Sequence, residues 1–412
     1  MVSAVTQRFV VGAAMALLCF HEGRCVEVPS EAGAPRVVTL EEALAAADST
    51  PDVVIARAKE RIAEAGIRSA RTPGEPSLTL ATHSVTARAS AAVSVPFRWG
   101  GQRAWAVGAA KAERDMAARS REASIATARR LCRVAWFTLA ANEDRLRAAI
   151  DSASRSERNK RAVDDLFEVE RAPRLDAARA TAESATAGAA RAGADQAVVA
   201  ASAELRALLG IEEGRLSAGT ARPIPPAEGS LEAWRLRALA SSPDLTVAQA
   251  ELRATEARVT QRSRERLPAT SLEAGADWND PTQPGTDASL GLGITFPTRG
   301  RAALDAARAD RDRAAALLDL ARRRVVADVE TAWSAAGAAR LRFEAVDQVA
   351  RPAAAEAAEL TRIAYEEGKL DLFRLLDAER ALTEIERDHA DAYKEWGTAF
   401  ADLLRLAPEG TP

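Results

Sequence analysis

The chain has 412 residues, of which 47% are hydrophobic but only 4% aromatic, and a formal net charge of −3 at pH 7. Alanine, leucine, arginine and glutamate recur in nearly every segment, and these are strong helix formers that lose little rotamer entropy on folding. Such a composition is typical of long helices or coiled coil and argues against a compact α/β enzyme. Acidic and basic residues are mixed without a basic block, so we expect no nucleic-acid partner.

The N-terminus has the pattern of a secretory signal peptide. Arg8 precedes a mostly apolar run from Phe9 to Phe20, which polar residues follow. The run is too short for a spanning helix, which needs about 20 apolar residues. We therefore predict export, with residues 1–25 as the signal peptide, although the sequence does not fix its end. A short membrane anchor or a buried helix is the alternative.

The chain contains an internal duplication. Pro51-Asp52 recurs as Pro243-Asp244, a shift of 192 residues (243 − 51), and several alanine, arginine, glutamate and proline residues recur at the same shift. Each half is expected to run helix, two extended segments, very long helix, turn, helix. We divide the chain into a first repeat (36–210), a linker rich in glycine and proline (211–230), a second repeat (231–406) and a tail (407–412).

Two pairs of extended segments show period-two alternation. In the second repeat, residues 272–278 and 290–296 alternate apolar with polar or small side chains around a turn expected at 279–285. The first repeat shows the same pattern more faintly within 77–95, only 19 residues (95 − 77 + 1) for two strands and a turn. A soluble hairpin on a core gives this alternation, and so does a membrane β-strand of about ten residues. The pattern alone does not choose between them.

Each repeat then contains a very long helix. Residues 103–168 and 301–366 each span 66 positions (168 − 103 + 1 and 366 − 301 + 1) and contain almost no glycine. At 1.5 Å per residue each helix would extend about 100 Å. Pro352 is expected to kink or interrupt the second one. After a turn, helices resume to about Leu209 and Leu406.

Four strands per chain cannot close a barrel. An open sheet edge in a bilayer leaves backbone groups unpaired, whereas three copies would supply twelve strands and a lumen. Apolar side chains would then face lipid. Arg88, Glu273 and Asp277 would face the lumen.

Several local phrases resemble one known family. They are residues 95–103, which contain Gly100-Gly101-Gln102-Arg103, and residues 365–368 followed by 375–379. With the order of segments and the doubling, they are similar to the outer membrane efflux proteins, the TolC family, over roughly 40–406. The stretch from Gly100, with residues 112–115, is closest to the subgroup that serves cobalt–zinc–cadmium efflux.

This resemblance implies a mainly α fold with a small β part. Duplicated long α-helical hairpins and four β-strands per chain would trimerise into a 12-stranded β-barrel and an α-helical barrel. It implies a homotrimer in outer-membrane lipid whose helices reach through the periplasm to a periplasmic adaptor (membrane fusion) protein. An inner-membrane pump of the resistance-nodulation-division type would deliver the cargo. The duct would be passive, with no cofactor, and would carry heavy-metal cations, or otherwise drugs or small molecules.

The resemblance also suggests where control lies. By similarity, Asp371 and Asp377 lie at the periplasmic mouth, where carboxylates of three copies would form rings that attract cations. Alternatively, Asp371 is an ordinary helix-start residue. Tyr365 and Asp176 match a pair that ties the mouth closed in the family. The sequence departs from the family pattern at three positions: Glu170 replaces a glycine, Leu370 a closing arginine, and Arg374, which would weaken a ring, an acidic residue.

Other functions lack their motifs. The sequence has no Gly-rich phosphate loop ending in Lys-Ser or Lys-Thr, no His-Glu-x-x-His, no Cys-x-x-Cys and no Gly-x-Ser-x-Gly. We therefore expect no enzymatic activity and no dedicated metal site. A periplasmic coiled-coil adaptor or scaffold is the competing hypothesis, because it would share the long helix pairs. It would not need the duplicated alternating hairpins.

Overall fold

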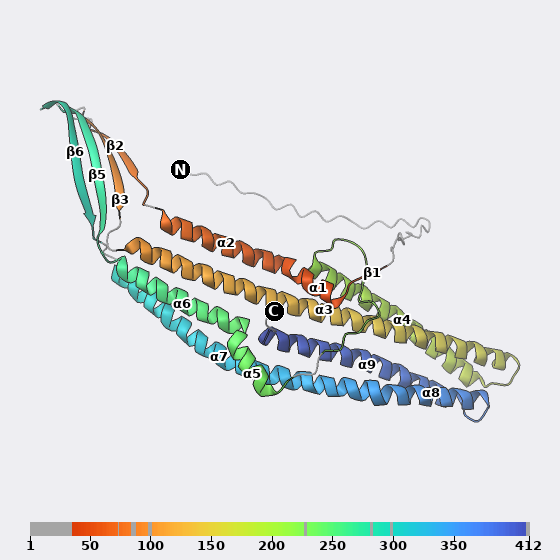
Figure 1. Ribbon diagram of the computed structural model, residues 1–412. Coiled ribbons are helices and arrows are strands. Elements are labelled where there is room, and N and C mark those ends of the chain that lie inside the picture. The colour runs from red at the N-terminus through yellow and green to blue at the C-terminus, as the bar shows by residue number, and fades with distance from the viewer. Residues whose placement is uncertain are drawn as a thin grey trace, which may run out of the picture.

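The computed structural model describes residues 35–72, 74–83, 88–97, 101–225, 229–280, 283–296 and 300–408. The expected signal peptide lies outside these residues. The described chain is elongated, with a β-sheet at one end and the turns of two helical hairpins at the other (Figure 1). The confirmed fold class is therefore mainly α with a small β part.

The two halves contain corresponding elements in the same order. Proline begins both α2 and α6, because a proline in the first helical turn needs no hydrogen-bonded N–H. The first half comprises α1 (Leu40–Ala46), the short 3₁₀ turn η1 (Ala47–Ser49), α2 (Pro51–Arg71), β2 (Ser77–His83), β3 (Arg88–Phe97), α3 (Gln102–Glu168) and α4 (Arg174–Leu209). The second comprises α5 (Leu231–Ser241), α6 (Pro243–Arg264), β5 (Ala269–Asp280), β6 (Gln283–Thr295), α7 (Gly300–Ala345), η2 (Val346–Ala350), α8 (Arg351–Glu366) and α9 (Leu372–Leu406).

The two long helices differ in one respect. α3 runs for 67 residues without a break, about 100 Å at 1.5 Å per residue. The second helix widens into a π-helical turn, η2, and then continues as α8, whose second residue is Pro352. Pro352 was expected to kink or interrupt this helix. The structure shows a continuous helix, because the wider π-helical turn accommodates the proline ring.

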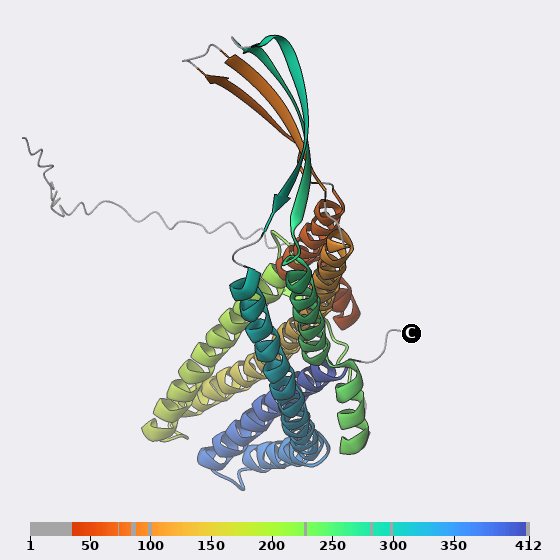
Figure 2. The same ribbon diagram turned by 90° about the vertical axis from the view of Figure 1, so that its left-hand side faces the viewer.

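Sheet and helices are arranged in the same lateral order. The sheet order is β2-β3-β5-β6. Next to it, α2 packs on α3, α3 on α6 and α6 on α7; towards the hairpin turns, α4 packs on α3, α3 on α9 and α9 on α8. Figure 2 shows the narrow, curved sheet rising from one end of the helices. In every layer the first-repeat and second-repeat elements meet in the middle and leave one element of each repeat at the outer edge.

The strands are longer in the second repeat than in the first. β5 and β6 have 12 and 13 residues, against 7 and 10 for β2 and β3. The turn predicted at 279–285 is too wide, because the strands pair as far as Asp280 and Gln283. Antiparallel pairing of β3 with β5 joins the two hairpins into one sheet.

The main core lies at the middle of the helical bundle. Buried aromatic residues of α3, α7 and α9 pack there, with ring centroids of Phe137 and Tyr393 5.3 Å apart and those of Phe343 and Trp396 5.2 Å apart. A two-stranded parallel sheet, β1 (Arg36–Val37) with β4 (Leu216–Ser217), crosses the bundle at the same level. These aromatic residues thus pack together where both repeats and the linker meet.

Gly397 of α9 is expected to tolerate no side chain. A Cβ atom there would lie 2.3 Å from the ring of buried Phe137. Overpacking of this kind costs about 1–3 kcal/mol, so Gly397→Ala should lower the midpoint of thermal unfolding. Gly337→Ala on α7 is the matched control, because nothing lies within 4 Å of its Cβ position and alanine is the better helix former. An unchanged midpoint for Gly397→Ala would contradict the packing.

Candidate functional site

One face of the four-stranded sheet is apolar and exposed. The register places Leu78, Val93, Ala274 and Leu290 opposite one another in a single row across the sheet. Leu290 is 77% exposed, and other large apolar residues of the same face are also exposed. They are Leu80, Val95, Leu272, Trp278, Leu292 and Ile294. A continuous apolar face of this size, without a covering element in the described chain, is a surface for another apolar phase or another protein.

The opposite face is polar or small. Directly opposite residues include Ser94 with Glu273, and Ser90 with Asp277, which in turn pairs with Asp287. Glu273 Oε1 also accepts a hydrogen bond from Ser271 Oγ at 3.2 Å. The structure therefore places Glu273 and Asp277, two of the predicted lumen residues, on one face. Arg88 belongs to this face by register, but its side chain lies outside the described part.

Glycines on β5 and β6 make room for these polar side chains. A Cβ atom at Gly293 would lie 2.3 Å from Ser271 Oγ and 3.0 Å from Glu273 Oε1. At Gly275 it would lie 2.9 Å from Ser289 Oγ. This explains why glycine alternates with apolar residues on β6. The apolar side chains of β6 lie on the apolar face, and at Gly293 on the polar face the side chains of Ser271 and Glu273 from β5 occupy the space that a β6 side chain would take.

The junction of sheet and helices is fixed by Gln102. This residue, the first of α3, is buried, and its side-chain Nε2 donates to the carbonyl oxygens of Arg264 and Leu267, each at 3.2 Å. Both carbonyls lie where α6 ends and the chain turns into β5, and the Arg264 carbonyl also accepts a hydrogen bond from Leu267 N–H at 3.1 Å. Gln102 thus ties the start of one repeat's long helix to the strand entry of the other repeat.

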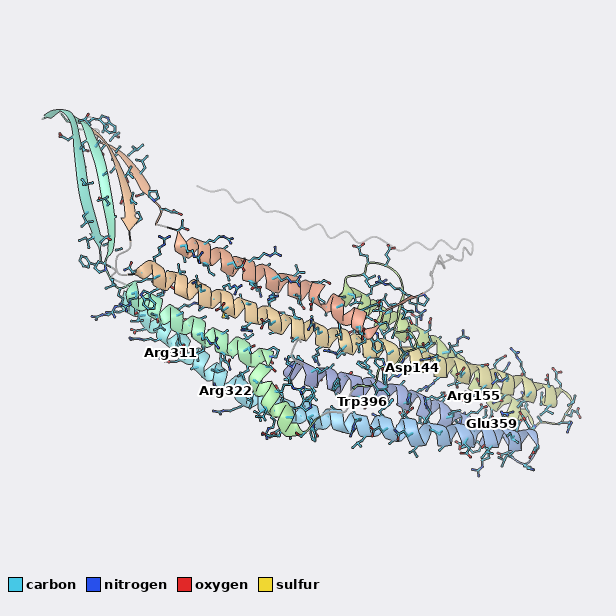
Figure 3. The ribbon with its side chains drawn as sticks, in the orientation of Figure 1. Asp144, Arg155, Arg311, Arg322, Glu359 and Trp396 are labelled. Carbon is cyan, nitrogen blue, oxygen red and sulfur yellow. The ribbon has the colours of Figure 1, made fainter. Side chains whose placement is uncertain are left out.

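The linker is bound across the bundle by Arg222. Its guanidinium donates to both carboxylate oxygens of Asp144, at 3.0 and 2.8 Å, and to the carbonyl of Ala140 at 3.2 Å. Figure 3 labels Asp144 on α3, further from the sheet than Trp396 of α9. The Tyr393 hydroxyl donates to the carbonyl of Pro223 at 3.0 Å. The linker therefore holds α3 and α9 together at this level.

The two hairpin turns have the same geometry but different residues. Gly368, with φ 72°, donates its N–H to Tyr365 O at 2.9 Å; Glu170, with φ 58°, donates to Phe167 O at 3.0 Å. Glu170 is the single non-glycine residue with positive φ in the described part of the chain. A left-handed conformation costs a residue with a side chain about 1–2 kcal/mol. Glu170, which stands where the family pattern has glycine, therefore adopts the same backbone conformation as Gly368 at the cost of backbone strain.

Tyr365 and Asp176 lie near each other within one chain. Tyr365 packs against a small cluster that includes Val163, Ala180 and Leu376, and burial raises the pKa of its phenol, as does the negative charge of Asp176. No hydrogen bond joins the two side chains in the described residues. Asp176 instead pairs with Arg179 at 4.0 Å.

Asp371, Arg374 and Asp377 are exposed and are not brought together into one cluster. Asp371 caps α9, because its Oδ1 accepts a hydrogen bond from the Arg374 N–H at 3.1 Å. This is the geometry of an ordinary helix-start residue. Asp377 lies further along α9, near Arg380, which pairs with Glu183 of α4. A ring of carboxylates from several copies would have to form from these exposed positions.

Features of two other kinds are not found in the described chain. None of the helices in the described ranges is both long enough and apolar enough to cross a membrane. The described residues also contain no group of three or more histidine, cysteine, aspartate or glutamate side chains that could hold a metal ion. Cys132 is buried and free, and burial raises the pKa of its thiol.

The sequence matches a family model twice. The model for the outer membrane efflux protein matches residues 43–211 and 234–407, most of the chain and nearly all of both repeats. The chain belongs to the outer membrane efflux protein family. As a member it is an outer-membrane efflux channel protein whose helices lie in the periplasm. The alternative of an adaptor or scaffold is not favoured.

Individual relatives agree with this assignment. The chain is 27% identical to the cobalt-zinc-cadmium resistance protein CzcC of Cupriavidus metallidurans over 377 residues, covering 86% of this chain and 85% of that protein. Its fold is similar to that of the CmeC outer membrane channel of Campylobacter jejuni, with a TM-score of 0.76 at 14% identity and 95% and 93% of the two chains covered. CusC matches with a TM-score of 0.73 at 17% identity, over 91% of this chain and 94% of that one.

Two residues that position elements of this chain, Gln102 and Arg222, were not predicted from the sequence. Gln102 stands inside the phrase on which the resemblance rests, so a signal was present, but no role could be assigned before its partners were known. Arg222 gave no signal, because it lies in an irregular linker and its partners Asp144 and Ala140 are about 80 positions away in the sequence. Members of this family are in general channels and not enzymes.

Gln102→Ala is expected to weaken the junction. The substitution removes the donor of the Leu267 carbonyl, whereas the Arg264 carbonyl keeps the Leu267 N–H. A buried polar group left unsatisfied costs about 1–3 kcal/mol. The free energy of unfolding should therefore fall by about 1–3 kcal/mol in urea titration, whereas Arg103→Ala, at the exposed neighbouring position, should change it little. Equal stability of the two variants would show that Gln102 does not hold the junction.

Proposed function

We propose that three copies of this chain form a closed duct through the outer membrane. The observation that carries the proposal is a sheet with one exposed apolar face and two outer strands, β2 and β6, that each pair on one side only in the described sheet. In lipid such edges must find partners, since an unpaired backbone group costs several kcal/mol. Pairing of β2 with β6 of the next copy supplies them, and three copies give a 12-stranded barrel.

The outer helices support the same assembly. α2 and α4 lie at one side of the molecule, α7 and α8 at the other. Each carries large apolar side chains that its own chain leaves exposed. They are Val54, Ile55 and Ile62 on α2, Leu175 and Val199 on α4, Leu317, Leu320 and Leu341 on α7, and Leu360 and Ile363 on α8. Contact between the two sides in a homotrimer would bury them and continue the barrel as a helical tube.

We further propose that the duct carries heavy-metal cations. The likeness to a cobalt-zinc-cadmium resistance protein over most of both chains supports this cargo, and so do Glu273, Asp277 and Asp287 on the face that would line the lumen. Drugs or other small molecules are the alternative cargo. The chain itself acts as a passive path, without enzymatic activity or cofactor.

The partners follow from this arrangement. An adaptor in the periplasm and an inner-membrane pump of the resistance-nodulation-division type would deliver the cargo to the hairpin turns. Asp371, Asp377 and Arg374 would set the charge of this mouth, and the proximity of Tyr365 to Asp176 supports a closing contact between the two hairpins. Residues 1–25 would be removed on export, and the duplicated units would be 36–210 and 231–406.

Leu290→Arg is expected to prevent stable insertion. An arginine on the lipid face of a barrel strand costs about 2–4 kcal/mol near the bilayer midplane. The variant should be extracted from the membrane fraction by urea, whereas wild type should remain. Gly291→Arg is the matched control, because it places the same side chain on the opposite face, where a Cβ meets Glu273 only at 3.8 Å. Equal retention of both variants would count against a lipid-facing sheet.

The cargo can be tested in the cell of origin. Deleting the gene should increase sensitivity to zinc, cobalt and cadmium, because the export path is lost, and the wild-type gene should restore resistance. Sensitivity to drugs, measured in the same strains, tests the alternative cargo. Unchanged growth inhibition by all three metals would contradict the metal assignment and leave the duct architecture intact.

A further inference from the structure

The long second helix has a weak point at η2. Pro51 and Pro243 are harmless because each lies at the start of a helix, but Pro352 follows a helix that is already 46 residues long. A proline inside a helix removes one backbone hydrogen bond and crowds the carbonyl four residues earlier. The π-helical turn Val346–Ala350 absorbs this crowding. Local departures from the α-helical hydrogen-bond pattern are places where helices bend.

The side chains at this turn share one carboxylate oxygen. Asp347 Oδ1 lies 3.1 Å from His389 Nε2 of α9 and 3.0 Å from the Arg351 guanidinium of α8. The imidazole ring of His389 also packs on Phe343, with centroids 5.2 Å apart. His389 therefore connects α9 to the last turn of α7 and to the π-helical turn. Its polar contact is with Asp347 Oδ1, which the permanently charged Arg351 also contacts.

Further charged groups face the same junction from α3 and α9. The Arg155 guanidinium lies 3.9 Å from Glu386 Oε2 and donates to Thr383 Oγ1 at 3.1 Å. Figure 3 places Arg155 beyond Asp144 along α3, towards the hairpin turns. Both Glu386 Oε2 and Arg155 Nε are buried and lack a hydrogen-bond partner. Asp151 of α3 is close enough to act on Glu386 electrostatically. The junction thus holds an incompletely satisfied network.

The charge state of His389 follows from these neighbours. Burial lowers its pKa from the ordinary 6.5, Arg351 lowers it further, and Asp347 only partly opposes them. The folded surroundings of His389 therefore favour the neutral ring. The stability that they contribute is fully present above pH 6.5 and is lost as the pH falls through the lowered pKa. Burial raises the pKa of Glu386, against the attraction of Arg155. Protonation of His389 then places a second cation beside Arg351 at the one carboxylate oxygen, Asp347 Oδ1, that both contact.

We propose that His389 is a proton sensor. When it is protonated, the imidazolium and the Arg351 guanidinium compete for Asp347 Oδ1, and this competition loosens the π-helical turn at the base of the α8–α9 hairpin. Mild acid then increases the mobility of α8 relative to α9 and α3. The link to transport rests on the proposed function, in which this hairpin forms part of the periplasmic mouth. The loosening itself is a property of the folded chain and needs no cargo, adaptor or pump.

Hydrogen exchange of the full-length purified protein in detergent tests the proposal. Peptides within 353–366 are compared between wild type and His389→Gln at about pH 7.5 and about pH 5.5, on either side of an ordinary histidine pKa. Intrinsic exchange rates cancel, because the same peptide is compared at the same pH. The two proteins should exchange alike at the higher pH, and wild type should exchange about threefold faster or more at the lower pH. Equal exchange at both pH values would overturn the proposal.

Two control variants separate sensing from general destabilisation. His83→Gln changes the other histidine of the described chain and should retain the full acid response of wild type. Arg351→Gln removes the competing cation, so protonated His389 keeps Asp347 and the acid-induced increase should disappear. If Arg351→Gln retains the wild-type increase, or if His389→Gln exchanges faster than wild type at both pH values, His389 is a packing residue and the proposal is wrong. A loss of metal resistance has no bearing on these outcomes.

Discussion

Backbone groups at the two edges of the sheet constrain everything else in this molecule. β2 and β6 each have one strand neighbour in the described chain, and the face between them is apolar. Water could satisfy such edges, but lipid could not. The apolar face and the open edges therefore make conflicting demands on a single copy, and the closed ring of copies proposed above would meet both demands.

The duplication explains how one chain offers matching edges. In each layer the elements of the first repeat lie on one side and those of the second on the other, so the outermost elements always come from different repeats. Buried and half-buried polar contacts join the repeats along α3 and α9, among them Arg145 with Asp391 and Asn159 with Glu379. The interior seam thus fixes the register between repeats, and the outer sides remain available for other copies.

Rigidity is unevenly distributed along the helices. At mid-bundle, aromatic packing and the bidentate contact of Arg222 with Asp144 hold the linker across both repeats. Just beyond this level, η2 and the neighbouring unsatisfied groups of Arg155 and Glu386 form a less complete contact. The proposed loosening at η2 would therefore act beyond the level at which the linker holds the two repeats together.

The sequence by itself determined the helix and strand content, the doubling, the ends of the long helices near Glu168 and Glu366, and the family. Periodicity, proline positions and turn residues are local, so they can be read from neighbouring positions. Only the tertiary structure decided that β3 pairs with β5, that Gln102 and Arg222 hold distant segments, and that Pro352 is absorbed by a π-helical turn beside His389. These depend on contacts between residues far apart in the chain, for which a single sequence carries no local pattern.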